Sequence, residues 1–277
     1  MSTLDDRLAL LDAELGAVPG VLVAFSGGVD SGVVLAAAVR ALGAGRVVAA
    51  TAVSPSLPAA EQRAAHEFAV GLGVRHEQPR TDELSRAGYV ANAGDRCAFC
   101  KAELVDVLTP LAAELGIADV VTGTNADDLR AGFRPGIRAA AERGAWAPLA
   151  RAGMTKDDVR AAARRWELPL ADKPAAACLA SRIAYGVPVS TAGLARVEAA
   201  ETALRAALAG AGLAARDLRV RDLGDDVARV EVDAALVPQV GPELLAAVPG
   251  FARVELDPRG FRSGAMNELL PDPVRYR

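Results

Sequence analysis

Short apolar runs alternate with segments of helical periodicity through the first two-thirds of the chain. The runs predict strands at residues 21–25, 46–53, 74–78 and 118–123. Between them, apolar residues recur every three or four positions, which predicts helices at residues 4–15, 33–42, 58–72, 95–115, 137–143 and 155–166. Strands that alternate with helices are typical of an α/β fold with a doubly wound, mostly parallel sheet.

The pattern changes near residue 170. Residues 171–190 fit neither periodicity, so we interpret them as a loop-rich connector. Beyond the connector we expect helices at residues 191–209 and 236–248 and strands at residues 218–221, 227–232 and 251–256. These boundaries divide the chain into a first domain at 1–170, the connector, and a smaller α+β domain at 191–277.

The first predicted strand runs into the sequence SGGVDS, residues 26–31, which opens the next helix. Gly27 and Gly28 allow a tight turn and a close approach of the backbone to a ligand. The N–H groups of a helix N-terminus favour an anion, and Ser26 and Ser31 add hydroxyl donors. The pattern indicates a phosphate or pyrophosphate site, although it is neither GxxxxGK[ST] nor GxGxxG. A strand–turn–helix corner whose glycines serve geometry alone is the alternative.

Polar residues follow three of the predicted strands, at the ends that border the ligand crevice of an open α/β sheet. Asp30 is a carboxylate beside an anion site, which is unfavourable unless it holds a metal ion or a cationic partner. We interpret Asp30 as a Mg²⁺ or catalytic-geometry residue. Thr51, Asn125 and Asp127 are expected to border the same nucleotide.

The composition narrows the classes of function. The net charge is −4 and the pI about 5.4, so no global basic surface indicates a nucleic-acid partner. Without a run of 18 apolar residues, and with an acidic amphipathic N-terminus, the chain is expected to be soluble, cytoplasmic and not bound to a membrane. Three cysteines do not make a disulfide framework. His66 and His76 occur in no motif and are interpreted as surface or packing residues.

The loop SGGVDS resembles the PP-loop of the ATP pyrophosphatase (adenine nucleotide alpha hydrolase-like) superfamily, whose members cleave ATP between the α and β phosphates. Further stretches, DRCAFCK, TGTNADD, FRPG, DKPAAACLASRIAYG and GFRSGAMNE, narrow the resemblance. Together they are similar to the LarE-type sulfur transferases, or pyridinium-3,5-bisthiocarboxylic acid mononucleotide synthases, over nearly the whole chain. The resemblance implies a homo-oligomer, often a hexamer, that acts in nickel-pincer nucleotide biosynthesis.

The resemblance implies a reaction with ATP and Mg²⁺. Each carboxylate of pyridinium-3,5-biscarboxylic acid mononucleotide is activated by AMP and converted to a thiocarboxylate, and pyrophosphate leaves into the loop. Cys178 is then a catalytic thiolate, with Ser181 and Arg182 beside the substrate. Arg219 and Arg221 point to one face of a strand and by resemblance hold the mononucleotide phosphate. A solvated strand face is the alternative for these arginines. Weaker candidates for substrate or metal contacts, with solvated surface as the default for each, are Glu198, Glu201, Glu231 and Asp233.

The cysteines distinguish two versions of this chemistry. Some members carry only the connector cysteine and sacrifice its sulfur, which leaves dehydroalanine. This chain also has Cys97 and Cys100, three apart near a helix N-terminus, where thiolates are favoured. It therefore resembles the three-cysteine members, in which Cys97, Cys100 and Cys178 hold a [4Fe–4S] cluster that accepts sulfide from an external source. Three structural thiols, or a zinc site that lacks its fourth ligand, are the alternatives.

Other functions of the loop are weaker interpretations. A tRNA 2-thiolation enzyme would carry a basic surface, and the acidic pI disfavours it. An amidotransferase-like synthetase would need an ammonia source, and no glutaminase segment is present in the sequence. A nucleotide-binding sensor without chemistry would leave Asp30, the Asp172-Lys173 dipeptide and Cys178 without a purpose.

Overall fold

The computed structural model describes residues 3–130, 135–174, 177–262 and 264–270. Phe133 and Arg134 of the FRPG motif, Ala175 and Ala176 of DKPAAACLASR, and Ser263 of GFRSGAMNE lie outside the described residues. The chain forms two compact units. Unit 1 comprises residues 1–83 and 97–176, and unit 2 comprises residues 84–96 and 177–276.

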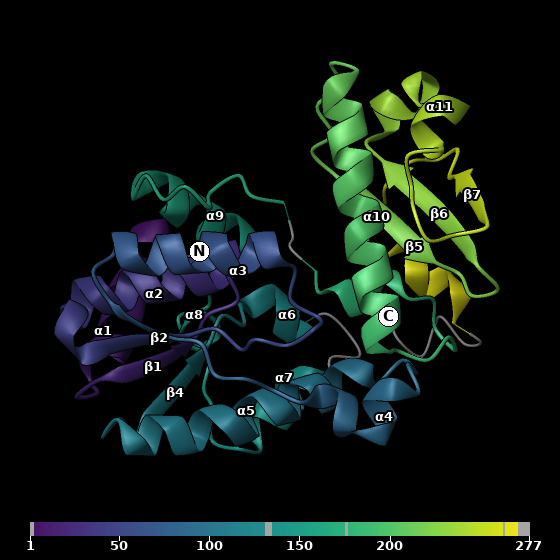
Figure 1. Ribbon diagram of the computed structural model, residues 1–277. Helices are drawn as coiled ribbons and strands as arrows, with labels where there is room; N and C mark the ends of the chain where they lie inside the picture. The colour runs from purple at the N-terminus through teal and green to yellow at the C-terminus, as the bar shows by residue number, and fades with distance from the viewer. Residues whose placement is uncertain (1–2, 131–134, 175–176, 263, 271–277) are drawn as a thin grey trace. The chain divides into compact units, whose positions relative to one another are not determined.

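Unit 1 is built on a four-stranded parallel sheet in the order β3-β2-β1-β4 (Figure 1). The strands are β1 (Val21–Ala24), β2 (Val47–Ala50), β3 (Arg75–Glu77) and β4 (Asp119–Thr122). Val21 is in register with both Val47 and Asp119, so the carboxyl ends of β1, β2 and β4 meet at one edge. The strands β1 and β2 are buried at every position, as expected for a sheet covered on both faces.

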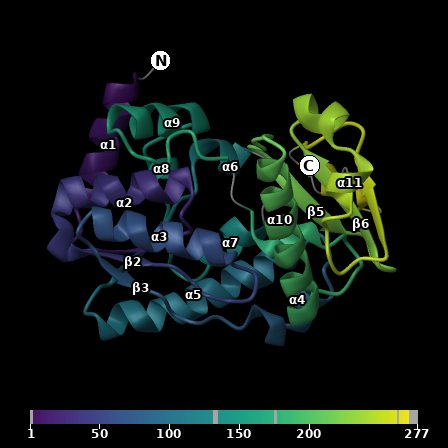
Figure 2. The same cartoon turned by 45° about the horizontal axis from the view of Figure 1, so that its top comes forward.

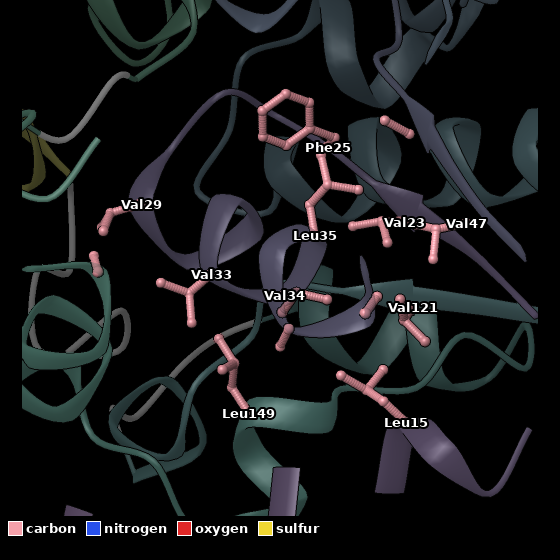
Figure 3. Close-up of a cluster of buried hydrophobic side chains, with 14 of the residues drawn as sticks. Leu15, Val23, Phe25, Val29, Val33, Val34, Leu35, Val47, Val121 and Leu149 are labelled. Atoms are coloured by element: carbon pink, nitrogen blue, oxygen red, sulfur yellow. The ribbon is translucent and has the colours of Figure 1, made fainter. Parts of the chain in front are cut away.

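Two hydrophobic clusters flank the sheet of unit 1, because successive side chains of a strand point to opposite faces. Val21 and Val23 pack in the larger cluster (Figure 3), which includes residues of α1 (Leu4–Gly16), α2 (Val29–Leu42), α3 (Ala59–Gly71), α8 (Pro148–Arg151) and α9 (Lys156–Arg165). Leu22 and Ala24 pack in the smaller cluster, with residues of α5 (Arg96–Glu114) and α7 (Pro135–Ala141). The helix α5 lies on the side of the sheet opposite α2 (Figures 1 and 2). The predicted α/β fold with helices on both faces is confirmed.

The helices of unit 1 follow the predicted pattern closely. They are α1 (Leu4–Gly16), α2 (Val29–Leu42), α3 (Ala59–Gly71), α5 (Arg96–Glu114), α6 (Ala126–Arg130), α7 (Pro135–Ala141), α8 (Pro148–Arg151) and α9 (Lys156–Arg165), with the 3-10 turn η1 (Ala44–Arg46). A second 3-10 turn, η2 (Glu83–Ser85), lies where the chain passes from unit 1 to unit 2. The helix α9 begins with a capping box, in which Thr155 and Asp158 each accept the other's backbone N–H.

Unit 2 is a three-stranded sheet covered by one long helix. The strands β5 (Leu218–Asp222) and β6 (Val227–Val232) are antiparallel, and β7 (Arg253–Leu256) pairs parallel with β6. The helix α10 (Thr191–Gly210) buries Leu204 and Leu208 against Leu218 and Val220 of β5. The remaining elements are α4 (Ala87–Val90), α11 (Pro242–Leu245) and the 3-10 turns η3 (Leu179–Arg182), η4 (Ala234–Gln239) and η5 (Ala265–Leu269).

Two features of the local structure were not predicted. The helix expected at 236–248 is interrupted after η4, because Gly241 and Pro242 follow and proline has no N–H with which to continue a helix. Residues 126–130, for which no helix was predicted, form α6, since the Asn125 side-chain oxygen accepts the N–H groups of Asp127 and Asp128. Cys178 lies in the loop-rich connector as expected, directly before η3.

The structure also groups residues 84–96 with unit 2, whereas the sequence analysis placed them in the first domain. The buried Asn92 explains this, because its amide nitrogen donates to the carbonyl groups of Ala184 and Val187, each at 2.8 Å. The Arg96 guanidinium likewise donates to the Ala180 carbonyl at 2.9 Å. Among the described residues, no helix is long and apolar enough to cross a membrane.

Candidate functional site

The SGGVDS loop leaves β1 and enters α2 as a closed turn. Gly27 has φ +72°, in the left-handed region, and Gly28 is the N-cap of α2. The Ser31 hydroxyl donates to the Gly28 carbonyl at 3.2 Å and accepts the Ser26 N–H at the same distance. The Ser26 and Ser31 hydroxyl oxygens are 3.1 Å apart. Contacts among Ser26, Gly28 and Ser31 therefore hold the loop in a defined shape at the start of α2.

The segment after β4 lies directly against the first turn of α2. A Cβ atom at Gly123 would be 2.6 Å from the Ser31 backbone nitrogen, so only glycine permits this approach. Asn125, two residues further, donates from its side-chain amide to Asp30 Oδ1 at 3.0 Å. The structure thus brings together Asp30 and Asn125, which are 95 residues apart in the sequence.

Lys156 joins this group, and sequence reasoning missed it. Its ammonium group is ion-paired with Asp30 Oδ2. Its backbone N–H donates to Asp127 Oδ2 at 2.8 Å, so Asp127 also belongs to the group. Asp30 therefore has the cationic partner that a carboxylate beside an anion site requires. Lys156 is the first residue of α9, and its position after the Thr155 cap was the only signal in the sequence.

A second lysine that the sequence analysis did not name as a site residue contacts the loop itself. Lys173 Nζ donates to the Gly27 carbonyl oxygen at 3.0 Å and to Glu61 Oε2 at 2.6 Å. Glu61 lies in the first turn of α3. The loop therefore contacts lysine side chains from α9 and from the segment after it, although its own sequence contains neither lysine nor arginine.

Thr51 supports the loop from the interior and is only 2% exposed. Its hydroxyl donates to the Phe25 carbonyl at 2.8 Å, one residue before the loop, and lies 2.8 Å from His76 Nε2. Because the Thr51 proton is used toward Phe25, His76 Nε2–H is the donor to Thr51. His66 Nδ1 is 3.2 Å from His76 Nδ1. Burial, followed by the charge of His66, lowers the pKa of His76.

Cys97 and Cys100 lie in the first two turns of α5, three residues apart and so on one face of the helix. Cys97 is exposed and Cys100 is half-buried. Lys101 follows Cys100 in α5, and both cysteines and Asp128 are close enough to affect its pKa. Burial lowers the pKa of Lys101, and the charges of Cys100, Cys97 and Asp128 oppose that shift. Thiolates are the usual ligands of iron–sulfur clusters, so the donor type of this cysteine pair fits such a cluster.

Cys178 belongs to unit 2 and is exposed. Its carbonyl oxygen accepts hydrogen bonds from the Ser181 hydroxyl at 2.7 Å and from Arg182 Nη1 at 3.0 Å. The Arg182 guanidinium, 4% exposed, is also held by both carboxylate oxygens of Glu201, at 2.8 and 3.1 Å. Arg182 therefore fixes the backbone at Cys178 and leaves the thiol accessible. Within the described part of the chain, no group of three or more His, Cys, Asp or Glu side chains is gathered as a metal centre.

Arg219 and Arg221 share one face of β5, as their spacing predicted, but that face is buried. Arg221 Nη2 is 2.7 Å from Glu231 Oε2 on the neighbouring strand, and Arg221 Nη1 donates to the Ser181 carbonyl at 3.0 Å. The Arg219 guanidinium lies over the Phe261 ring, 5.1 Å from its centroid. Burial, followed by the charge of Arg182, lowers the pKa of Arg219 to about 10.

Three buried arginines of unit 2 form one group with acidic side chains. Arg182 is paired with Glu201 and Arg221 with Glu231, and the charges of Glu201 and Asp217 act on Arg219. Among the side chains that the structure describes, buried Arg221 Nε has no hydrogen-bond partner. A buried donor without a partner suits a ligand that carries an acceptor oxygen. The alternative of a solvated strand face is wrong, and Glu201 and Glu231 are likewise held in ion pairs rather than solvated.

Glu198 and Asp233 lie at the margins of this unit. Glu198 is half-exposed on α10. Asp233 Oδ2 accepts the backbone N–H groups of Arg216 and Asp217, at 2.7 and 3.2 Å, and so fixes the chain before β5.

Comparison with known proteins shows to which family the chain belongs. No protein-family model matches the chain. An uncharacterised protein of Synechocystis is 40% identical over 274 residues, which cover 96% of this chain and 99% of that protein. The pyridinium-3,5-bisthiocarboxylic acid mononucleotide synthase of Lactiplantibacillus plantarum is 35% identical over 277 residues, which cover 98% of this chain and 97% of that enzyme. A protein of Methanocaldococcus jannaschii is 32% identical over 144 residues, about half of each chain. The chain belongs to the family of the pyridinium-3,5-bisthiocarboxylic acid mononucleotide synthases.

Proposed function

We propose that this protein is an ATP-dependent sulfur transferase that converts the carboxylates of pyridinium-3,5-biscarboxylic acid mononucleotide to thiocarboxylates. The observation that carries the proposal is the SGGVDS loop at the N-terminus of α2, with Asp30 held by Asn125 and Lys156. The name of the Lactiplantibacillus relative supports the substrate class.

The first step activates a carboxylate, because sulfur cannot displace oxide from it. A substrate carboxylate oxygen attacks the α-phosphorus of ATP, which forms the acyl-adenylate and releases pyrophosphate. The loop N–H groups and the hydroxyls of Ser26 and Ser31 would bind the pyrophosphate. Mg²⁺, when bound near Asp30 and Asp127, would offset the charge of the leaving group.

The second step transfers sulfur. A thiolate attacks the acyl carbon, and AMP leaves. If the thiolate is Cys178, the product is a thioester of the protein, and removal of the Cys178 α-proton with cleavage of its Cβ–Sγ bond releases the thiocarboxylate and leaves dehydroalanine. The exposed thiol of Cys178, on a backbone fixed by Ser181 and Arg182, suits such an attack.

We favour the catalytic version of this step, in which Cys97, Cys100 and Cys178 hold a [4Fe–4S] cluster. Such a cluster supplies an open iron that binds an external sulfide. The shared helical face of Cys97 and Cys100 supports this version. Arg219 and Arg221 would hold the phosphate of the mononucleotide, which the buried positive charge and the unpartnered Arg221 Nε support.

The products distinguish this function from other uses of ATP. The protein is incubated with ATP, Mg²⁺ and the pyridinium dicarboxylate, and the products are separated by chromatography. We expect AMP and pyrophosphate in equal amounts, with a thiocarboxylate when sulfide is present. Release of ADP and phosphate would show that the proposed reaction is wrong.

A further inference from the structure

The chain contains very few lysines. Of its 31 basic residues, 28 are arginines and three are lysines: Lys101, Lys156 and Lys173. Exposed ion pairs such as Arg165–Asp5 and Arg151–Glu14 use arginine, although either residue type serves in a solvated pair. Lysine is therefore an uncommon residue in this chain, and its compact ammonium group is not equivalent to a planar guanidinium.

Two of the three lysines contact the PP-loop and its helix. Lys173 contacts Gly27 within the loop, and Lys156 contacts Asp30 in the first turn of α2. Each is also paired with a carboxylate, Lys173 with Glu61 and Lys156 with Asp30. The hydrogen bonds of Lys173 account for two of its three N–H donors and leave the third for a ligand oxygen.

One face of α9 carries Lys156 and two arginines that hold the segment around Lys173. Lys156, Arg160 and Arg164 recur every four residues, so they lie along one side of the helix. Arg160 donates to the carbonyl oxygens of Ala171 and Lys173, at 2.9 and 3.5 Å. Arg164 Nη2 is 2.8 Å from Asp172 Oδ1. Arg160 therefore holds the backbone on either side of Asp172 and Arg164 holds the Asp172 side chain, next to the residue whose side chain reaches Gly27.

We infer that Lys156 and Lys173 are the phosphate-binding cations of this loop, in place of the lysine that a Walker A loop carries in its own sequence. The inference rests on the proposed function, in which the loop binds ATP and pyrophosphate. Each ammonium group exchanges its carboxylate partner for a phosphate oxygen. Breaking the two ion pairs costs little because both are partly exposed, at 38% and 24% for Lys156 and Asp30 and 19% and 26% for Lys173 and Glu61. Such pairs contribute little net stability.

The test is calorimetric titration of the full-length protein with inorganic pyrophosphate and with MgATP. Lys173→Met and Lys156→Met should each weaken pyrophosphate binding by about 10- to 100-fold, the loss of one charge-assisted hydrogen bond. Lys173→Arg and Lys156→Arg keep the charge and should not restore full affinity. Arg63→Met, which removes an exposed charge from α3, is the control and should stay within about twofold of the wild type.

Glu61→Gln separates ligand binding from loop shaping. If Lys173 binds phosphate, this variant should bind pyrophosphate at least as tightly as the wild type, because a competing carboxylate is gone. Equal losses in Glu61→Gln and Lys173→Met, or wild-type affinity in both methionine variants, would overturn the inference. Lysine-dependent pyrophosphate binding in a protein that releases ADP and phosphate would overturn the proposed reaction alone. A wild-type protein that binds neither ligand would overturn both.

Discussion

Arg221 Nη2 and Glu231 Oε2 form a 2.7 Å ion pair between neighbouring strands, and both side chains are almost completely buried. A buried pair of this kind costs desolvation of two charges, so its net contribution to folding is small. Removing one partner lowers the free energy of unfolding strongly, because the other charge is then left in the interior without its counter-charge. Under the proposed function, the pair would link binding of the mononucleotide phosphate to the stability of unit 2.

Breaking the pair should be much worse than replacing it. Arg221→Ala should lower the free energy of unfolding by about 3–5 kcal/mol, since Glu231 would stay buried alone. The double variant Arg221→Met/Glu231→Leu should lose considerably less. Urea unfolding followed by far-ultraviolet circular dichroism measures both, with the exposed Arg253→Ala of β7 as control. Equal losses in the single and double variants would contradict a compensated buried pair.

Arg219 offers a test of ligand binding that leaves this pair intact. Arg219→Met should weaken binding of the pyridinium mononucleotide by about 10- to 100-fold, the loss of a charge-assisted contact to phosphate. ATP affinity should stay within about twofold, and Arg253→Ala should change neither affinity. The pKa of Arg219 is about 10, so wild-type binding should fall as the pH rises through that value and the guanidinium loses its charge. A parallel loss of ATP affinity would assign Arg219 to the nucleotide instead.

Asp30 should be essential for the ATP reaction. Asp30→Ala should lower the rate of pyrophosphate release by about two orders of magnitude, as expected when one preorganised charge is removed from a reacting site. The matched control is Asp157→Ala, an exposed carboxylate in the first turn of α9 next to Lys156. A stopped enzymatic assay for pyrophosphate measures both variants. Equal rates in Asp30→Ala and the wild type would remove Asp30 from the reaction.

Much of the fold was predictable because it depends on local pattern. The apolar run at 21–25 is buried on both faces, and the helix after it ends at Gly43 as its spacing indicated. The capping box of Thr155 and Asp158 was equally visible in the sequence. The break after residue 239 was missed because the apolar spacing of 236–248 outweighed Pro238 and Pro242. Proline was the better signal.

The candidate site was predictable only where residues follow strands. Asp30, Asn125 and Asp127 were expected to lie close together because the carboxyl ends of neighbouring parallel strands meet at one edge of the sheet. The structure places them in one group, in which Asn125 contacts Asp30 and Lys156 contacts Asp127. Lys156 and Lys173 reach the loop through tertiary contacts over 126 and 146 residues, which no local pattern reveals. Thr51 was expected at the nucleotide, but its hydroxyl is buried under the loop.

The stability of unit 1 should depend on pH through His76. Its pKa is lowered from 6.5 in the folded chain, first by burial and then by His66, so the unfolded chain binds the proton more readily. The free energy of unfolding is therefore highest above that value and falls as the pH decreases from 6.5 toward the lowered pKa.

Urea unfolding measures this effect through tryptophan fluorescence, since Trp146 and Trp166 both lie in unit 1. His76→Gln should abolish the part of the pH dependence of the unfolding free energy that arises from His76. His66→Gln should reduce it only partly, because burial of His76 remains. Identical pH profiles in His76→Gln and the wild type would contradict the assignment.

The cysteine variants distinguish the two sulfur sources. If a cluster supplies an open iron, anaerobically reconstituted protein should contain about four irons per chain. It should also form several thiocarboxylates per chain when sulfide is added. Cys97→Ser, Cys100→Ser and Cys178→Ser should each lose both cluster and turnover, since each thiolate is a ligand.

The sacrificial route gives a different set of results. Only Cys178→Ser would then be inactive, and product formation would stop at one sulfur per chain. The spent protein would lose the mass of H₂S at position 178, which intact-mass and peptide mass spectrometry detect. That mass loss together with an active Cys97→Ser variant would contradict the cluster.

The three carbonyl groups that Asn92 binds, those of Ile183, Ala184 and Val187, limit how this protein can be dissected. The chain leaves unit 1 after residue 83, returns at residue 97 and leaves again after residue 176, so neither unit is one contiguous segment. A fragment that starts at residue 177 would lose the donor for those carbonyls and the buried Tyr89 side chain of the same unit. Expression of either unit alone therefore needs a redesigned boundary. The C-terminal fragment needs residues 84–96 joined to it through a new linker, and the N-terminal fragment needs a short turn in their place.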